Sequence, residues 1–212
     1  KLQELQLTPD SPEALATLPS LEIQDVPKEI EKYPLEIKHQ GDSKILFHEL
    51  FTNDIAYTQI GFNTGSVPTE MIPYISLLGN LMLGMGTGKH SYAEISKLIG
   101  MHTGGIRTSH FSSATVQDRH QVLSYIIISG KALMEKVDNL FDIFDELLGD
   151  YSFGDHKRLV EIIRSAKADM EDSIVPHGNH YVSARLQSYQ SRLGKFDELT
   201  DGITYYQFLE QL

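Results

Sequence analysis

Apolar and polar residues follow different patterns in the two parts of this chain. Residues 1–28 show little periodicity and contain four prolines, so we expect an arm with one short helix over Ser11–Thr17. Farther along, apolar residues recur at every second position or at every third to fourth position, which predicts strands and helices. We therefore place a linker or arm over residues 1–33 and one domain over residues 34–212.

Five runs that are rich in strand-forming residues predict antiparallel strands. They cover Leu35–His39, Lys44–Leu50, Asp54–Thr64, Ile106–Val116 and Gln121–Ser129. The first two flank a Gly-Asp turn and are predicted to form a hairpin. The last is apolar on both of its faces, so we expect it in the centre of a covered sheet.

Helical spacing of apolar residues predicts helices in the remaining segments. They cover Pro68–Met85, Ser91–Met101, Lys131–Leu148, Asp155–Ile174 and Tyr181–Ser191. Strands and helices thus occur in groups, in the order β-β-β-α-α-β-β-α-α, and do not alternate one by one. This order predicts an α+β fold, in which an antiparallel sheet carries helices packed on one face.

Composition argues against several functional classes. The chain has 212 residues, a net charge of −11 and no cysteine. A phosphate backbone would repel such a charge, so we expect no nucleic-acid partner, and no run of about 18 apolar residues is present to span a membrane. The absence of cysteine excludes disulfides and thiolate metal sites. The acidic surface either attracts basic peptides or only maintains solubility.

The two ends of the sequence indicate a segment of a longer chain. The N-terminus lacks an initiator Met and has no basic region followed by an apolar region, so it does not match a secretory signal. The C-terminus stops within a helical apolar pattern. We therefore expect an excised piece of a larger protein.

The stretch Leu77–Tyr92 contains four glycines and a Gly-Lys pair, which raises the question of phosphate binding. A P-loop requires G-x-x-x-x-G-K-[ST], but Leu83 lies where the first glycine is required and His90 follows the lysine. The glycine spacing does not match a dinucleotide-binding loop either. A better explanation is an apolar helix that ends at a glycine, with a turn into a helix capped by Ser91 and Glu94.

An apolar helix, the turn Gly86-Thr87 and the sequence S-Y-A-E therefore follow one another here. This order resembles the inverzincin zinc metallopeptidases of the insulysin and pitrilysin type, which carry H-x-x-E-H on the helix before a Gly-Thr or Gly-Ser turn. With the two Gly-Thr turns aligned, the zinc histidines fall at Leu77 and Leu81 and the catalytic glutamate falls at Asn80. The resemblance thus implies a domain without catalytic, metal or cofactor-binding residues.

Further motifs narrow the resemblance to the presequence protease and falcilysin-like branch. The segment Asp10–Leu21 is similar to the linker that follows the N-terminal half of these enzymes. Four short motifs are similar to their non-catalytic third domain: Thr64–Pro68, Met85–Gly88, Thr103–Ile106 and the Gly178-x-His180 element. The resemblance covers nearly the whole chain.

The resemblance implies a non-catalytic segment of a zinc-dependent metalloendopeptidase that degrades short unfolded peptides. Such a segment would form part of the wall of a closed peptide chamber and would contact the zinc-bearing catalytic half of the same chain. It implies a bacterial cytoplasm or an organelle matrix as the location. A freestanding interaction or scaffold module of the same fold is the alternative. The residues that touch substrate stay unknown at this point.

Two groups of histidines are candidates for separate sites. His177 and His180, preceded by Glu171 and Asp172, are metal ligands by type. Pro176 interrupts the helix between these pairs, however, and no third ligand has a convincing spacing. Histidines that cap a helix or donate hydrogen bonds are the simpler interpretation.

The second group is His102 and His110, with Arg107, Ser109 and Ser112 nearby. A catalytic Ser/His pair is conceivable, but no orienting carboxylate and no nucleophile motif accompany it. Polar residues on an exposed strand face that lines a chamber explain the group more simply.

Two further groups of apolar residues lead to predictions about packing. Met71, Met82 and Met85 are expected to fill the core. The aromatic stretch Tyr205–Leu209 is expected to pack on a domain outside this chain or on a second copy, with self-association as the consequence.

Overall fold

The computed structural model describes residues 6–212, and the chain divides into two units, Lys1–Phe51 and Thr52–Leu212. The first unit contains the helix α2 (Pro12–Leu15), the turn η1 (Ile23–Asp25), and the strands β1 (Glu36–Gln40) and β2 (Ser43–Phe47). All of its described residues are exposed. The domain boundary that the sequence places after residue 33 stays a prediction.

Local chemistry explains the elements of the first unit. The Ser11 side chain accepts a hydrogen bond from the Ala14 N–H at 3.2 Å, and a proline follows the cap, as the sequence predicts. The strands β1 and β2 pair in an antiparallel register that brings Gln40 opposite Ser43. Gly41 has a φ of +57° in the two-residue turn between them, which glycine adopts without strain. The predicted hairpin is therefore confirmed, and it forms a two-stranded sheet of its own.

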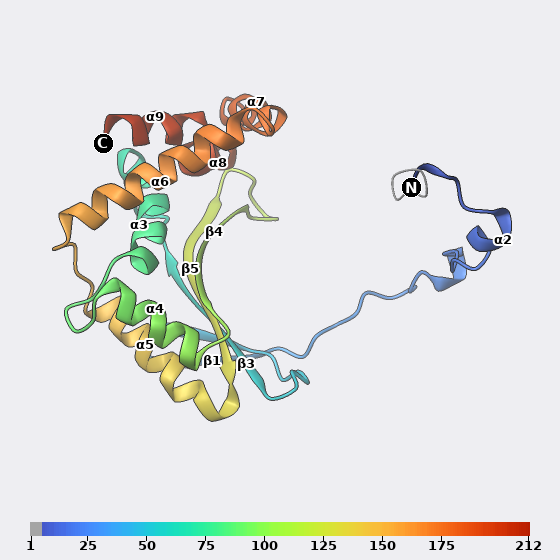
Figure 1. Cartoon of the computed structure of the whole chain (residues 1–212), viewed down its shortest axis with the longest axis horizontal. Coiled ribbons are helices and arrows are strands. Elements are labelled where there is room, and N and C mark those ends of the chain that lie inside the picture. Colours follow the sequence, from blue (N-terminus) through green and yellow to red (C-terminus); the bar gives the residue numbers. More distant parts are fainter. Residues whose placement is uncertain (1–5) are drawn as a thin grey trace. The chain divides into compact units, whose positions relative to one another are not determined.

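The second unit is built on a three-stranded antiparallel sheet with helices on one face (Figure 1). The strands are β3 (Ile55–Asn63), β4 (Ile106–Ala114) and β5 (Val122–Leu133), in the spatial order β3-β5-β4. Three helices lie on the covered face: α3 (Ile72–Gly84), α4 (Tyr92–His102) and α5 (Val137–Gly149). The predicted α+β class and the central position of the last strand are confirmed.

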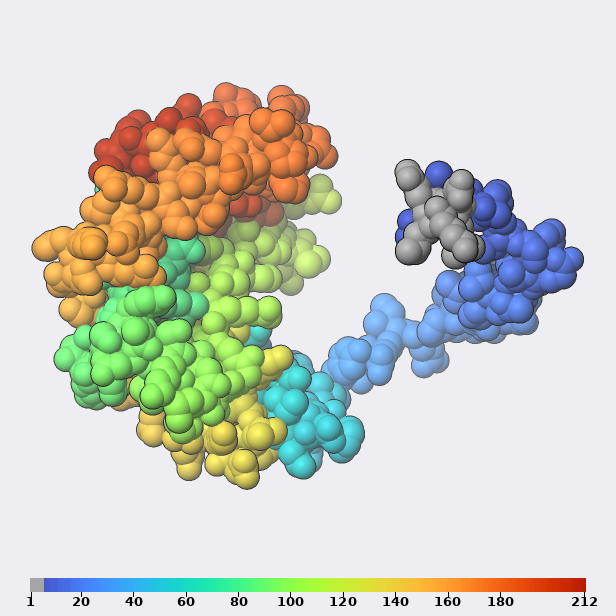
Figure 2. Space-filling model, in the orientation of Figure 1, coloured from blue at the N-terminus to red at the C-terminus, as the bar shows by residue number. Residues whose placement is uncertain are grey.

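Four more helices follow: α6 (His156–Ile174), α7 (Gly178–Ser188), α8 (Arg192–Asp201) and α9 (Ile203–Gln211). Figure 2 shows them, in orange and red, over one end of the second unit. The short turns η2 (Thr69–Met71) and η3 (Met134–Lys136) lead into α3 and α5. The interruption after Ile174 matches the sequence reading, whereas α8 and α9 are additions to the predicted order.

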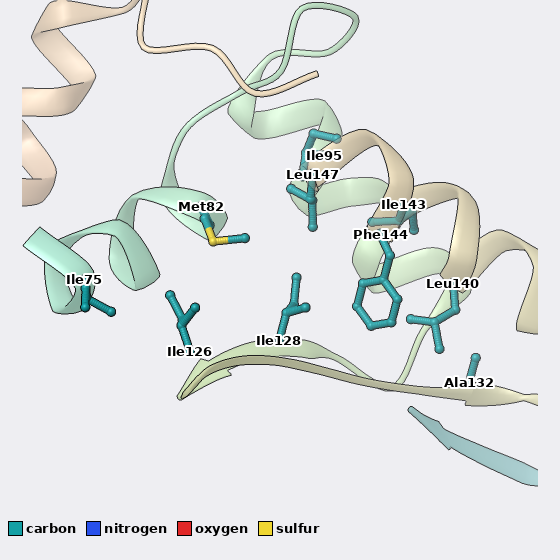
Figure 3. Packing of buried hydrophobic residues seen from close by; sticks show 10 residues of the cluster. All are labelled: Ile75, Met82, Ile95, Ile126, Ile128, Ala132, Leu140, Ile143, Phe144 and Leu147. Carbon is teal, nitrogen blue, oxygen red and sulfur yellow. The ribbon is translucent and has the colours of Figure 1, made fainter. Parts of the chain in front are cut away.

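The main core lies between the sheet and the helices α3, α4 and α5 (Figure 3). Ile126 and Ile128 point from β5 toward this core, and Phe144 and Leu140 from α5 face them. Leu140 is fully buried. Gly130 on β5 permits this contact, because a Cβ atom there would lie 2.7 Å from Leu140 Cδ1.

A second core joins α3 to α6 and α9. Helix α3 belongs to both cores: Ile75 and Met82 face the sheet, whereas Leu77, Leu81 and Met85 face the C-terminal helices. A helix that is apolar all round is buried on both sides, which explains the nearly uninterrupted apolar sequence of α3.

The opposite face of the sheet carries no helix of the second unit, so it is bare within residues 52–212, and the predicted packing of helices on one face is confirmed. Residues of β5 alternate between buried Ile126 and Ile128 and the half-buried Tyr125 and Ile127. The strands β4 and β5 curve so that the bare face is concave (Figure 1). We call this surface the open face.

Candidate functional site

Leu77 and Leu81, the positions that the resemblance aligns with zinc histidines, belong to a buried apolar cluster. Leu77 and Leu81 are 4% and 5% exposed and pack with residues of α6, α7 and α9, among them Ile162 and Tyr181. Asn80 is exposed. A divalent cation needs charged or polar ligands, so this part of α3 serves packing and not metal chemistry.

The glycine-rich turn after α3 is held by hydrogen bonds from within the chain. Thr87 donates its backbone N–H to the His90 carbonyl at 2.8 Å, and the Gly88 N–H donates to the Asp150 carbonyl at 2.8 Å. Gly86 allows a close approach, because a Cβ there would lie 2.7 Å from the His90 carbonyl oxygen. The N–H groups that a phosphate would need are therefore in use, and the rejection of a P-loop agrees with this geometry.

Glu146 on α5 fixes the same turn. Its Oε1 accepts hydrogen bonds from the Thr87 hydroxyl and, at 2.8 Å, from His90 Nδ1. Burial would raise the pKa of Glu146, but these two hydrogen bonds and the positive charge of Lys89 outweigh it and hold the pKa below its ordinary value. The sequence gives no signal for this contact, which joins residues 59 positions apart.

The next helix begins as the sequence predicts. Ser91 and Glu94 form a capping box, in which Glu94 Oε2 accepts from the Ser91 N–H at 2.9 Å. An open pocket of about 280 Å³ lies beside this cap. Arg158 lines it, but its Nε donates to the Gly84 carbonyl at 2.9 Å and its guanidinium lies over the Tyr92 ring at 4.0 Å. The arginine thus holds α6 against this turn.

The candidate metal residues around α7 do not converge. His177 Nδ1 donates to the Ser173 carbonyl at 3.2 Å, and His180 Nε2 lies 3.5 Å from an Asp201 carboxylate oxygen. Glu171 accepts from the Tyr206 hydroxyl at 2.9 Å instead. No cluster of three or more potential metal ligands occurs within residues 6–212.

The candidate residues on β4, from the second histidine group, are divided between the two faces of the sheet. His110 contacts α3 near Gly79, and Ser112 donates to Asp197 on α8 at 2.7 Å, so both face the helices. Arg107 and Ser109 alternate with them and lie on the open face. Burial lowers the pKa of His110. The predicted exposed strand face therefore holds only part of this group, and no Ser/His pair forms.

Two expectations about apolar groups need correction. Met82 and Met85 fill the two cores, but Met71 is 46% exposed and does not. The aromatic stretch Tyr205–Leu209 packs within the chain: Tyr205 is 5% exposed, and the Phe208 ring meets the Tyr74 ring edge-on. The proposed reason for self-association is thus removed, because α3 and α6 already cover this stretch.

Helix α7 instead carries an exposed apolar stripe that the sequence reading did not single out. Val182, Leu186 and Tyr189 are 61%, 57% and 78% exposed and lie on one helical face. Their i, i+4, i+7 spacing was available in the sequence, but the same spacing also marks residues that face a core. Only the tertiary structure separates the two cases.

A buried carboxylate joins the last three helices. Glu198 on α8 accepts from the Thr204 N–H and hydroxyl at 3.0 Å each and pairs with Arg185 Nε at 3.3 Å. Gly202 is required beside it, because a Cβ there would overlap the carboxylate. This carboxylate caps α9, and favourable charge at a helix N-terminus explains its burial.

A second pocket, of about 210 Å³, lies where β3 begins and β5 ends. Its lining is mostly apolar, with Ile55, Met101 and Leu133 among the contributors. Lys131 and Lys136 also line it. No carboxylate side chain belongs to the lining, and the sequence reading did not identify this pocket.

None of the helices in the described part is both long and apolar enough to cross a bilayer.

Comparison with known proteins shows to which family the chain belongs. The model of a family described as associated with peptidase M16, subfamily C, matches residues 1–212. The chain is 35% identical to Protein HypA of Clostridium perfringens over 209 residues, which are 99% of this chain and 22% of that protein. It is also 35% identical to Presequence protease 1, chloroplastic/mitochondrial, of Arabidopsis thaliana over 212 residues, which are 100% of this chain and 20% of that protein.

The chain thus spans about a fifth of the length of these curated relatives. A crystal structure of a conserved protein from Enterococcus faecalis has the same fold, with a TM-score of 0.52 and 17% identity over 74% of this chain and 40% of that one. The resemblance to the presequence protease branch is confirmed: the chain belongs to the family associated with peptidase M16, subfamily C.

Proposed function

We propose that this chain is a non-catalytic segment of a zinc-dependent metalloendopeptidase that degrades short unfolded peptides. The observation that carries the proposal is the burial of Leu77 and Leu81 at the positions of the family's zinc histidines. The family match and the relatives named as presequence proteases supply the class of the parent enzyme. Zinc and the catalytic glutamate belong to another part of that enzyme.

The open face is proposed as part of the wall of the peptide chamber. It is concave (Figure 1), and Phe111 and Tyr125 lie on it with their ring centres 6.4 Å apart. Partly exposed aromatic side chains on a curved sheet suit an unfolded peptide, which offers apolar side chains and no folded surface of its own. Arg107 and Lys131 are the charged residues among the strand positions of this face.

The apolar stripe on α7 is proposed as the contact with the rest of the parent chain. About four fifths of each curated relative lies outside the matched segment, so a large partner surface exists within the same polypeptide. An exposed row of Val182, Leu186 and Tyr189 would be buried there. The parent enzyme would act in a bacterial cytoplasm or an organelle matrix. The names of the presequence proteases, chloroplastic/mitochondrial and mitochondrial, support the second location.

Zinc content and peptidase activity test the proposal together. We expect the full-length protein to bind one zinc per molecule and to cleave an unfolded peptide, and the 212-residue chain to retain no stoichiometric zinc after dialysis. One zinc per 212-residue chain would contradict the assignment of Leu77, Asn80 and Leu81. It would direct attention to His177 and His180.

The alternative is a freestanding scaffold module of the same fold. The mass of the native protein separates the two functions: roughly 100 kDa indicates a segment of a peptidase, whereas 23.9 kDa, the mass of this chain, indicates a freestanding module.

A further inference from the structure

We propose that the pocket of about 210 Å³ at the end of the sheet binds the C-terminal residue of a peptide. The inference rests on the proposed function, because an enzyme that admits peptides brings free C-termini to this surface. The binding would involve the apolar side chain of that residue and its α-carboxylate.

The size of the pocket suits a single residue. Sites for drug-sized ligands and cofactors have volumes of about 300–1,000 Å³, which exceed this one. On β5, Lys131 and Leu133 lie on the side opposite the helices, whereas Ala132 between them is 2% exposed and belongs to the core. All three line the pocket, which therefore lies at the end of the sheet and reaches the core at Ala132.

The apolar part of the pocket lining, which we call the floor, stays partly exposed to solvent. Met101 and Leu133 are 54% and 48% exposed, and Ile55 completes the floor. Removing such surface from water is worth about 25 cal/mol per Å². An aliphatic or aromatic side chain is thus the chemistry that the floor favours.

Two ammonium groups lie beside this apolar floor. The stem of Lys131 packs on Gly104, where a Cβ would lie 2.9 Å from both Lys131 Cγ and Cε, so the chain holds the direction of this side chain. No ion-pair partner of Lys131 is found in the part of the chain that the structure describes. An unpaired cation beside an apolar surface favours an anionic group on the ligand.

Lys136 connects the two sides of the pocket. Its Nζ donates to the Met101 carbonyl at 3.1 Å, near the end of α4. The negative end of a helix would repel a carboxylate, but this hydrogen bond occupies the carbonyl and brings a positive charge to it. An ammonium group has three donors, so two remain for a ligand.

A peptide C-terminus matches both parts of the pocket. Its last residue carries the side chain and the carboxylate on the same Cα atom, and no internal residue with an apolar side chain has both. A free aliphatic carboxylate has the same two features, and the experiment distinguishes it from a peptide.

The experiment measures peptide binding to the full-length protein, with zinc removed by a chelator so that the peptide stays intact. Two fluorescein-labelled peptides of one sequence end in leucine, one as the free acid and one as the C-terminal amide. We expect the free acid to bind roughly fivefold more tightly by fluorescence anisotropy, as one or two partly exposed charge pairs would give. Hexanoate at equal concentration should not displace it.

Variants locate the effect. Lys131→Met keeps the aliphatic stem and removes the charge, and it should reduce the preference for the free acid; adding Lys136→Met should abolish it. Lys97→Met, an exposed lysine on α4 outside the pocket, is the matched control and should keep the preference. Because the comparison of acid and amide also works in the unmodified protein, a variant that fails to fold does not prevent the test.

Equal binding of acid and amide, or an unchanged preference in Lys131→Met, would overturn the inference. Displacement by hexanoate would assign the pocket to aliphatic carboxylates in general and would also overturn it. Peptide cleavage by the zinc-loaded protein without a preference for the free acid leaves the proposed function standing and removes only the pocket. If the zinc-loaded protein shows the preference for the free acid but cleaves no peptide, the proposed function fails and the binding of a peptide C-terminus in the pocket stands.

Discussion

Residues 6–51 and residues 52–212 differ in what happens to their apolar side chains. In the first unit Leu21, Ile23, Ile30 and Phe51 are 89–95% exposed, and every described residue is classed as exposed. In the second unit apolar residues form two cores around α3. The contrast indicates that the second unit is stabilised by its own packing, whereas the first has local hydrogen bonds and no core.

A two-stranded hairpin of this kind is marginally stable in water by itself. Ile37 and Leu46 lie opposite each other on one face of it, and they are 50% and 55% exposed. Strands with an apolar face need a third strand or a helix against them. The hairpin thus has an apolar face that no other part of the first unit covers.

The largest expected effect contrasts one phenylalanine from each unit. Phe144→Ala, at a residue 2% exposed, should lower the free energy of unfolding by about 3–5 kcal/mol, because it leaves a cavity beside β5. Phe51→Ala, at a residue 95% exposed, should change it by less than about 0.5 kcal/mol. Urea unfolding followed by circular dichroism measures both. Similar losses in the two variants would contradict the proposed difference between the units.

Alanine substitutions at two glycines of the second unit test how tightly the surrounding residues pack. Gly130→Ala should destabilise by about 1–3 kcal/mol, because the new Cβ would lie 2.7 Å from Leu140 and 2.8 Å from Phe144. Gly100→Ala on α4 should stabilise by about 0.5–1 kcal/mol, since nothing lies within 4 Å and alanine favours helix. Thermal unfolding of the two variants should shift in opposite directions, and a shift in the same direction would contradict this account.

The Glu146 contact adds a pH-dependent contribution to the second unit. The pKa of Glu146 is lower when folded than when unfolded, so the stabilisation is present above the unfolded pKa and is lost as the pH falls through the folded pKa. Glu146→Gln should therefore lower the free energy of unfolding by about 1 kcal/mol near pH 7. The difference from the unmodified chain should shrink below about pH 4.

Glu94→Gln is the matched control for this prediction. Glu94 also has a lowered pKa, caused by its hydrogen bonds with Ser91, but it lies in an exposed capping box. Its replacement should have a smaller effect than that of Glu146. If Glu146→Gln lowered the free energy of unfolding equally at every pH, the shape of the side chain and not its charge would explain the contact.

The smallest effect on stability is expected on α7, which belongs to the second unit but is exposed like the first. Tyr189→Ser, at a residue 78% exposed, should change the free energy of unfolding by less than about 0.5 kcal/mol. In the full-length protein the same change should weaken the contact between this segment and the rest, which limited proteolysis would detect as faster cleavage. Unchanged proteolysis would remove α7 from the proposed contact.

Local patterns in the sequence were sufficient for most elements of the fold. The cap at Ser11, the capping box at Ser91 and the hairpin turn at Gly41 depend on residues a few positions apart, so their chemistry is visible in the sequence. The strong periodicity of residues 131–148 likewise predicted α5, but its start was wrong, because β5 continues to Leu133 and α5 begins only at Val137. The assignment of the family's zinc positions to Leu77 and Leu81 came from the resemblance and stays a prediction.

Contacts between residues that are far apart in the chain could not be predicted from such local patterns. Periodicity marked β5 as apolar on both faces, but only the arrangement of α3, α4 and α5 decides which face is covered. Periodicity also indicated apolar residues in both α7 and Tyr205–Leu209. In the structure Tyr205 and Leu209 are buried, whereas Val182 and Leu186 on α7 are exposed. The Glu146 contact and the pocket at Lys131 join segments that are far apart in the chain.

The sequence by itself thus determined most of the elements and their grouping into an α+β fold, because these depend on local propensity and residue type. The tertiary structure decided which apolar surfaces are buried within the described chain and which stay exposed. The physical reason is that burial depends on which surfaces meet, and a single periodic pattern is compatible with several such arrangements.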